Sequence, residues 1–245
     1  MKLNFALIFR PRAVAALWLS FAVLAAPVLA GEKYLEPRDF DGIALLPPPP
    51  LAGSAEQLAD LSSARAVFKA RTPDEQARAE KDASLSLFNF ASAIGDHFKR
   101  GSFPKLEALF ATVKTNISEI IDTPKNHWKR TRPYANDPEL VLGQPESSFS
   151  YPSGHSTRGT MQALILAEIF PERREPILEF GRTIGWDRVL IGKHYPTDVN
   201  AGRVLGQAIV RELMKSPAFQ RDLAAVKAEV EPARAAKPAA EAVAK

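Results

Sequence analysis

The sequence predicts an all-α fold, a single-domain helical bundle in the part of the chain that follows residue 30. Three observations support this. Apolar residues recur at helical spacing in several segments, helix-start patterns precede those segments, and no segment has the strict apolar–polar alternation of a half-buried strand. Residues 31–245 are long enough for one domain with a substantial core. We divide the chain into a leader (1–30), a helical domain (31–230) and a tail (231–245).

The leader has the pattern of a secretory signal peptide. Lys2, Arg10 and Arg12 give it a positive start, and residues 13–25 are apolar but too few to span a bilayer with ease. Small or aliphatic residues precede Ala30, after which we expect cleavage. The alternative is an uncleaved membrane anchor. The signal peptide predicts a periplasmic or secreted bacterial protein with no stable membrane span after cleavage.

Removal of the leader changes the charge of the chain. The formal net charge falls from +4 to +1, because the leader contains three basic residues and no acidic one. This near-neutral charge argues against nucleic-acid binding. The chain also contains no cysteine. Its core must therefore hold the fold without disulfides, and thiol chemistry is excluded.

The domain begins with an irregular segment, 31–51. It ends in Leu45–Pro50, a run with four consecutive prolines, which fix φ and remove backbone donors. We expect an extended strap on the domain surface rather than a ligand for a proline-binding domain.

Two helices are expected next. Ser54 can cap a helix that extends to about Arg71. Thr72 followed by Pro73 and two acidic residues is a strong start signal for a second helix, which we expect to end near Ile94.

Later helices are predicted from apolar spacing and from proline at their starts. One begins near 104, and the others cover about 122–132, 155–170, 171–191, 196–214 and 217–230. Residues 135–151 should form a loop. The segment 231–245 is mostly Ala, Pro, Lys and Glu, which predicts a disordered tail.

Lys125 and Arg132 form the first candidate binding pair. Seven residues on a helix are about two turns, so both side chains should project from one face. The alternative is a solvated basic face, because Lys129 and Arg130 are close in sequence.

Ser153, Gly154 and His155 form the second candidate group. A Ser-Gly turn before a helix directs backbone N–H groups outward, and the helix dipole favours an anion there. His155 would stand at the rim of that anion site. The alternative is a Ser N-cap followed by a structural histidine.

Arg188, His194 and Asp198 form the third candidate group. Asp198 should stay ionised at the start of a helix. A carboxylate bonded to one imidazole nitrogen fixes the tautomer of His194 and leaves the other nitrogen free as a nucleophile. Taken alone, a histidine four residues before an aspartate is usually structural.

These three groups, in this order and spacing, resemble the signature of the type 2 phosphatidic acid phosphatase superfamily, which also contains vanadium haloperoxidases. The chain is most similar to bacterial class A nonspecific acid phosphatases. Further likeness lies in 45–50, 150–155, 166–169 and 217–220, and it extends over about 34–230.

The resemblance implies an all-α fold with the active site at helix ends. It implies that His194 is the nucleophile, held by Asp198, and that His155 protonates the leaving oxygen. It further implies that the phosphoryl oxygens are bound by a set of residues from all three groups: Lys125, Arg132, Ser153, Gly154 and Arg188. No metal or cofactor is expected, because lysine and arginine supply the positive charge.

The expected function is metal-independent hydrolysis of phosphomonoesters at acidic pH through a phosphohistidine. The expected partners are small phosphomonoesters and inorganic phosphate, while homo-oligomerisation stays open. The alternatives are a vanadate-dependent haloperoxidase and a noncatalytic phosphate-binding bundle. One departure from the family pattern is Asp187, which stands where a serine is usual. We expect its carboxylate to oppose phosphate binding and to stabilise a protonated histidine.

Overall fold

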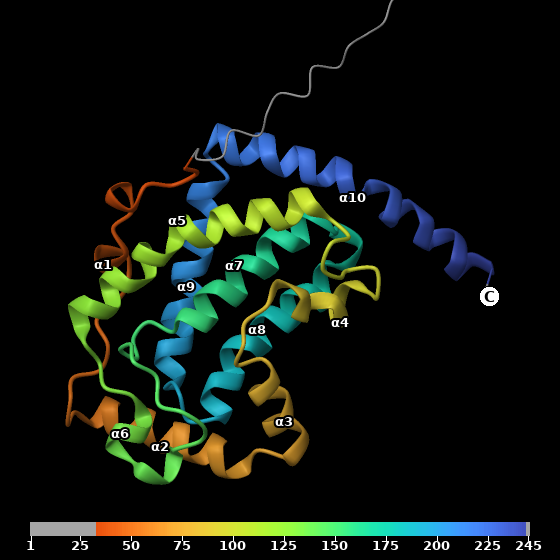
Figure 1. The fold of residues 1–245 in the computed structure, drawn as a ribbon. Coiled ribbons are helices and arrows are strands. Elements are labelled where there is room, and N and C mark those ends of the chain that lie inside the picture. Colours follow the sequence, from red (N-terminus) through yellow and green to blue (C-terminus); the bar gives the residue numbers. More distant parts are fainter. Residues whose placement is uncertain (1–32, 244–245) are drawn as a thin grey trace, which may run out of the picture. The chain divides into compact units, whose positions relative to one another are not determined.

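The computed structural model describes the backbone of residues 33–243 and the side chains of residues 33–235 (Figure 1). This part of the chain is all-α and contains no strand, which confirms the predicted fold class. The predicted leader, 1–30, lies outside the described residues. None of the helices described combines the length and the apolar character needed to cross a membrane.

The longer helices carry most of the fold, and short helical turns join them. The helices are α1 Gly42–Leu45, α2 Ala55–Ala70, α3 Pro73–Lys81, α4 Ala91–Ile94, α5 Pro104–Trp128, α6 Pro133–Asn136, α7 Gly154–Ile169, α8 Arg174–Leu190, α9 Pro196–Leu213 and α10 Pro217–Val243. The 3₁₀ turns are η1 Pro37–Asp39, η2 Leu87–Phe90, η3 Pro138–Leu140 and η4 Pro171–Arg173.

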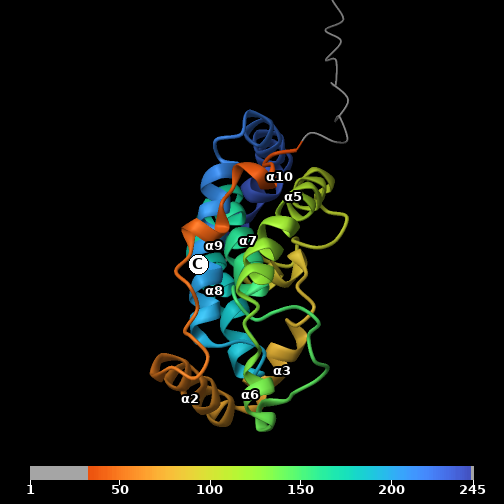
Figure 2. The same cartoon turned by 90° about the vertical axis from the view of Figure 1, so that its left-hand side faces the viewer.

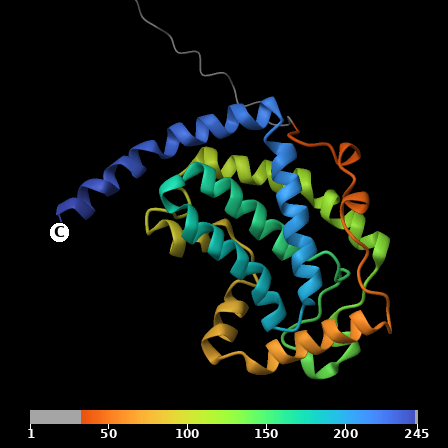
Figure 3. The same ribbon diagram turned by 180° about the vertical axis from the view of Figure 1, so that it is seen from behind.

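Helix α7 is the central element, and it packs along α8 and α9 (Figures 1 and 3). Glycines permit the close approach. A Cβ at Gly181 of α8 would lie 2.4 Å from the Cβ of Ala163, and a Cβ at Gly206 of α9 would lie 2.6 Å from the carbonyl oxygen of Thr157. This packing fixes the start of α7 beside the end of α8 and the start of α9, where the predicted site residues lie.

Helix α5 is held at its N-terminus by α10, which packs against it (Figure 2). The backbone N–H groups of Lys105 and Leu106 donate to the carboxylate of Glu229 at 3.0 and 3.1 Å. Phe103 provides no side-chain cap. A residue of α10 therefore satisfies the donors that a helix start leaves unpaired.

Several predicted boundaries are wrong. Helix α3 ends at Lys81 rather than near Ile94. A separate 3₁₀ turn, η2, follows at Leu87, where the Ser86 side chain accepts from Phe88 N–H. The helices expected near 104 and 122–132 are one helix, α5, with Pro124 inside it. It ends at Trp128 because Lys129 is left-handed, with φ 49°.

The last helix also differs from expectation. Helix α10 continues past Val230 to Val243, through most of the segment for which we expected a disordered tail. Helical turns also occur within the predicted loop, at α6 and at η3. They begin at Pro133 and Pro138, and proline suits the first position of a helix.

Candidate active site

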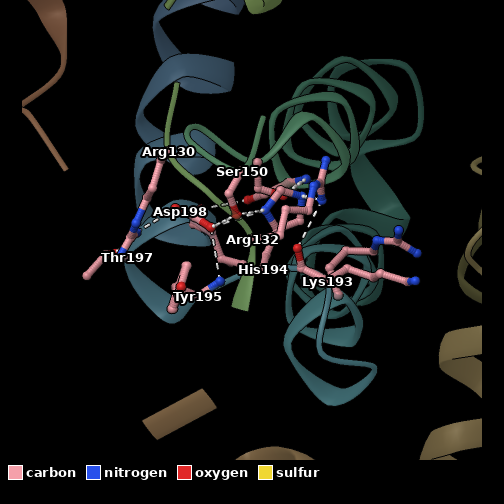
Figure 4. Close-up of polar contacts among 12 residues, drawn as sticks. Arg130, Arg132, Ser150, Lys193, His194, Tyr195, Thr197 and Asp198 are labelled. Atoms are coloured by element: carbon pink, nitrogen blue, oxygen red, sulfur yellow. Dashed lines mark hydrogen bonds and ion pairs between the residues drawn. The ribbon is translucent and has the colours of Figure 1, made fainter. Parts of the chain in front are cut away.

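His194 lies in the turn between α8 and α9, and its ring is held from both sides (Figure 4). Its Nδ1 lies 3.2 Å from Asp198 Oδ2, and its Nε2 lies 3.2 Å from Arg132 Nη1. A guanidinium can only donate, so Nε2 must accept. The two contacts together favour the neutral tautomer with its proton on Nδ1 and a lone pair on Nε2.

The pKa of His194 is well below its ordinary value. Burial is the main cause, and the nearby charges of Arg132 and Lys125 lower the pKa further. The hydrogen bond and charge of Asp198 act in the opposite direction without overcoming burial. The folded structure therefore favours the neutral imidazole.

Asp198 is fully buried in the first turn of α9. Its Oδ2 accepts from Tyr195 N–H at 3.0 Å and from Ser150 Oγ at 2.5 Å, while Oδ1 pairs with Arg130 at 2.6 Å. Burial alone would raise the pKa of Asp198, but the hydrogen bond to His194 and the charge of Arg130 bring it to about 2.

Two of the predicted cations are held by backbone carbonyls. Lys125 Nζ donates to Phe149 O at 2.7 Å, and Arg132 donates to Ser148 O and Lys193 O, both at 2.9 Å. Burial, and then the charge of Arg132, lowers the pKa of Lys125 to about 7. Below that pH the site contains both cations. Since Arg132 lies beyond the end of α5, the two do not share one helix face as expected.

Arg188, at the end of α8, is 2% exposed and contacts a carboxylate. Its Nη2 pairs with Glu146, while Nε and Nη1 are buried and have no partner among the described residues. Burial would raise the pKa of Glu146, but the charges of Arg188 and Arg132 outweigh it and lower that pKa. The ionised carboxylate of Glu146 thus forms an ion pair with Arg188, the residue that we expected to bind phosphate.

The Ser153–His155 group begins α7, as predicted. Ser153 caps the helix through a bond from Ser156 N–H at 3.3 Å. The N–H of Ser153 donates to Asp198 O at 3.0 Å, so it is not directed outward as expected. The next two N–H groups, of Gly154 and His155, stand at the positions that a helix leaves unpaired.

His155 Nε2 donates to Ala83 O at 3.0 Å, in the segment after α3. Burial, followed by the charge of Arg188, lowers the pKa of His155 to about 4. The Ala83 carbonyl and Glu146 limit that decrease. His155 is therefore protonated only at acidic pH, unless another anion approaches.

The structure brings all the predicted site residues into one region at the end of the central helices. Sequence reasoning missed Arg130, which we considered part of a solvated basic face. It is 7% exposed and donates to Asp60 at 2.7 Å and to Gln57 at 2.6 Å, both from α2, and to Thr197 at 2.7 Å. Its guanidinium also stacks over the Tyr195 ring at 3.9 Å.

No local signal distinguishes Arg130 from Lys129, because its partners come from elsewhere in the chain. Ser150 and Glu146 were likewise missed, although both lie in the short segment before the Ser153–Gly154 turn. Among the described residues, no three His, Cys, Asp or Glu side chains converge in a way that could hold a metal ion.

Asp187, the departure from the family pattern, is 1% exposed and pairs with Arg78 of α3. Arg78 Nη2 donates to Asp187 Oδ1 at 2.9 Å. Burial raises the pKa of Asp187, and the hydrogen bond and charge of Arg78 oppose that rise. The carboxylate is neutralised by α3 rather than left to act alone on the site.

Comparison with known proteins shows the family of the chain. Residues 105–222 match the PAP2 superfamily. The chain is 29% identical to an acid phosphatase of Zymomonas mobilis, with 91% of this chain and 92% of that protein covered. It is 31% identical to a non-specific acid phosphatase of Providencia stuartii (77% and 80% covered) and 29% identical to one of Salmonella typhimurium (76% and 78% covered).

The all-α fold is thus that of a PAP2 phosphatase. The chain belongs to the PAP2 superfamily and, within it, to the non-specific acid phosphatases.

Proposed function

We propose that this protein hydrolyses phosphomonoesters at acidic pH, without a metal ion, through a phosphohistidine on His194. That it is a phosphatase follows from its family. The observation that supports the finer mechanism is the double restraint on His194. Asp198 accepts from Nδ1 and Arg132 donates to Nε2, each at 3.2 Å, so the reactive lone pair points to the cationic side of the site.

The proposed reaction has two steps. Arg132 Nη1 turns from Nε2 to a phosphoryl oxygen, which frees the Nε2 lone pair to attack phosphorus. The bond from phosphorus to the alcohol oxygen breaks, and His155 gives its proton to that oxygen. Water then attacks the phosphohistidine, with His155 taking its proton, and releases inorganic phosphate. Lys125, Arg132 and Arg188 stabilise the charge on the three non-bridging oxygens of the phosphoryl group, together with N–H groups at the start of α7.

The acidic working range follows from the two histidines. His194 must be neutral and His155 protonated, and the pKa of free His155 is about 4. A bound phosphate dianion would raise the pKa of His155, because an opposite charge favours the imidazolium. Activity should therefore extend above pH 4 when substrate is bound. It should fall as the pH approaches 7, because His155 then loses its proton.

The test is to trap the intermediate. Wild-type protein mixed with labelled substrate and quenched in alkali should hold phosphate that acid releases, and EDTA should not reduce turnover. His194→Ala should lose at least about three orders of magnitude in kcat and trap nothing. Trapped phosphate on His194→Ala, or loss of turnover in EDTA, would contradict the proposal.

His155 is tested separately by the leaving group. His155→Ala should lose much more activity on an alkyl phosphate than on p-nitrophenyl phosphate, whose leaving group needs no proton. Equal losses on both substrates would exclude His155 as the acid. We also propose, from the predicted leader, that the protein is periplasmic or secreted, which cell fractionation tests.

A further inference from the structure

A cleft of about 760 Å³ has His155 among its lining residues. It lies between α5, α7 and the segment that precedes α4, and its floor is apolar. Phe110 and Ile117 of α5 and Met161 of α7 are 6%, 0% and 2% exposed, respectively. Half-buried side chains of Leu85, Leu87 and Phe88 form one wall.

The cleft extends away from the proposed catalytic residues along two helices. On α7, its lining residues run from His155 to Gln162, which is a rise of about 10 Å. On α5, Ile117 and then Phe110 lie progressively further from Lys125, the residue at the site end of that helix. His155 therefore stands at the inner end of an apolar channel.

The charge around the cleft is positive, which attracts an anionic phosphate ester to it. Arg100, Lys114 and Arg158 line it, against a single acidic residue, Glu107. Two polar groups along α7 are also unused. Arg158 Nε and Gln162 Oε1 are buried and have no hydrogen-bond partner among the described residues. The cleft thus combines apolar walls, a positive rim and a free donor and acceptor.

We propose that this cleft binds the alcohol part of the substrate, and that it selects phosphomonoesters of extended apolar alcohols over those of small polar ones. The inference rests on the proposed function, because it takes His155 as the group that protonates the leaving oxygen. That oxygen must lie beside His155, so the carbon chain bonded to it enters the cleft. Phosphate itself stays with the cations around His194.

The test compares ethyl, butyl and octyl phosphate, each below its aggregation concentration, by release of inorganic phosphate. For the wild type, kcat/KM should rise with chain length, by at most about fourfold for each fully buried methylene. Ala111→Trp should flatten this rise, because Ala111 is an exposed residue of α5 that lines the cleft.

The matched control is Thr115→Trp, which puts the same side chain at an exposed position of α5 outside the cleft lining. It should leave the chain-length dependence intact. A second variant, Phe88→Ala, should lower kcat/KM for octyl phosphate several-fold more than for ethyl phosphate. Melting temperatures of all variants identify any that fail to fold.

The outcomes separate the two proposals. Hydrolysis of every ester with no dependence on chain length, or an Ala111→Trp variant that keeps the wild-type dependence, would overturn the cleft as an alcohol site. That result would leave the phosphatase mechanism standing. Failure to hydrolyse any ester, p-nitrophenyl phosphate included, would instead overturn the proposed function.

Discussion

At the scale of single residues, Glu146 and an incoming phosphate need the same guanidinium. Glu146 pairs with Arg188, and the positive charge of Arg188 and Arg132 keeps its carboxyl ionised. Two anions cannot share this group without repulsion. Phosphate must therefore displace the Glu146 side chain, which is 33% exposed and can turn to solvent.

We expect Glu146→Gln to tighten the inhibition constant for inorganic phosphate by roughly tenfold, which is about 1.4 kcal/mol. The same change removes a negative charge that raises the pKa of His155. The basic limb of the activity profile should therefore move to lower pH. Competitive inhibition measured from pH 4 to 7 checks both effects.

Glu139→Gln is the control for Glu146→Gln, since Glu139 is an exposed carboxylate of the same region that pairs with Lys69. It should change neither quantity. An inhibition constant that is the same in Glu146→Gln and the wild type would show that Glu146 does not compete with phosphate for Arg188.

At the scale of elements, Arg130 joins α2 to the start of α9. It binds Asp60 of α2 and Asp198 of α9, so one guanidinium serves two buried carboxylates. Arg130→Met would leave both without their cation, and a broken buried pair costs roughly 3–5 kcal/mol. We expect a lower unfolding free energy in urea and a raised pKa for Asp198.

The effect on catalysis distinguishes positioning from plain stability. With the Asp198 pKa raised, the acid limb of kcat should shift to higher pH, and kcat should fall at least about tenfold for each 1.4 kcal/mol lost in the transition state. Arg130→Lys should recover part of this. Lys129→Gln, at the exposed neighbouring residue, should behave as wild type. An unchanged pH profile in Arg130→Met would show that Arg130 contributes to stability and does not position Asp198 for catalysis.

Helices α3 and α8 are joined by the Arg78–Asp187 pair, whose two members differ in exposure. The Asp187 side chain is 1% exposed and that of Arg78 is 40% exposed. Arg78→Gln leaves a buried carboxylate without its partner, whereas Asp187→Ser leaves a cation that can reach water.

We therefore predict an asymmetry between these two variants. Arg78→Gln should reduce the unfolding free energy by about 3 kcal/mol or more, and Asp187→Ser by roughly half that or less. Urea unfolding of both, and of the double variant, measures the coupling. Equal losses of unfolding free energy in the two variants would show that Arg78 does not compensate the buried charge of Asp187.

At the scale of the whole molecule, the sequence predicted what depends on near neighbours. Helix starts at Pro104, Pro196 and Pro217 agree with the structure, because proline at the first turn is a local preference. The end of α3 at Lys81 was missed, since helical apolar spacing continues past it. The burial of Arg130 was missed because its Asp60 partner lies 70 residues away.

The catalytic group shows the same division. Three motifs gave the residue types and their order, and packing of α7 against α8 and α9 brings them together. The ion pair between Glu146 and Arg188 could not be predicted, because it depends on the path of a segment with little regular structure. The cleft depends on how α5, α7 and the segment before α4 pack together, which spacing along either helix does not contain.

Two histidines of the site make the unfolding free energy depend on pH. The pKa of His155 is lowered to about 4 by burial, and that of His194 is lowered well below its ordinary 6.5. In the unfolded chain both histidines take up a proton near pH 6.5. The unfolded state thus binds more protons below that pH, so these groups stabilise the fold above pH 6.5 and lose that contribution as pH falls.

We therefore expect the unfolding free energy in urea to decrease from pH 7 to pH 4.5, within the range where the enzyme is proposed to work. His155→Asn should reduce the slope, because one of the two groups no longer titrates. Inorganic phosphate should raise the melting temperature more at pH 5 than at pH 8, since Lys125, with a pKa of about 7, is charged only at the lower pH. A stability that is constant from pH 7 to 4.5 in the wild type, or an identical slope in His155→Asn, would show that these histidines are protonated equally in the folded and unfolded states.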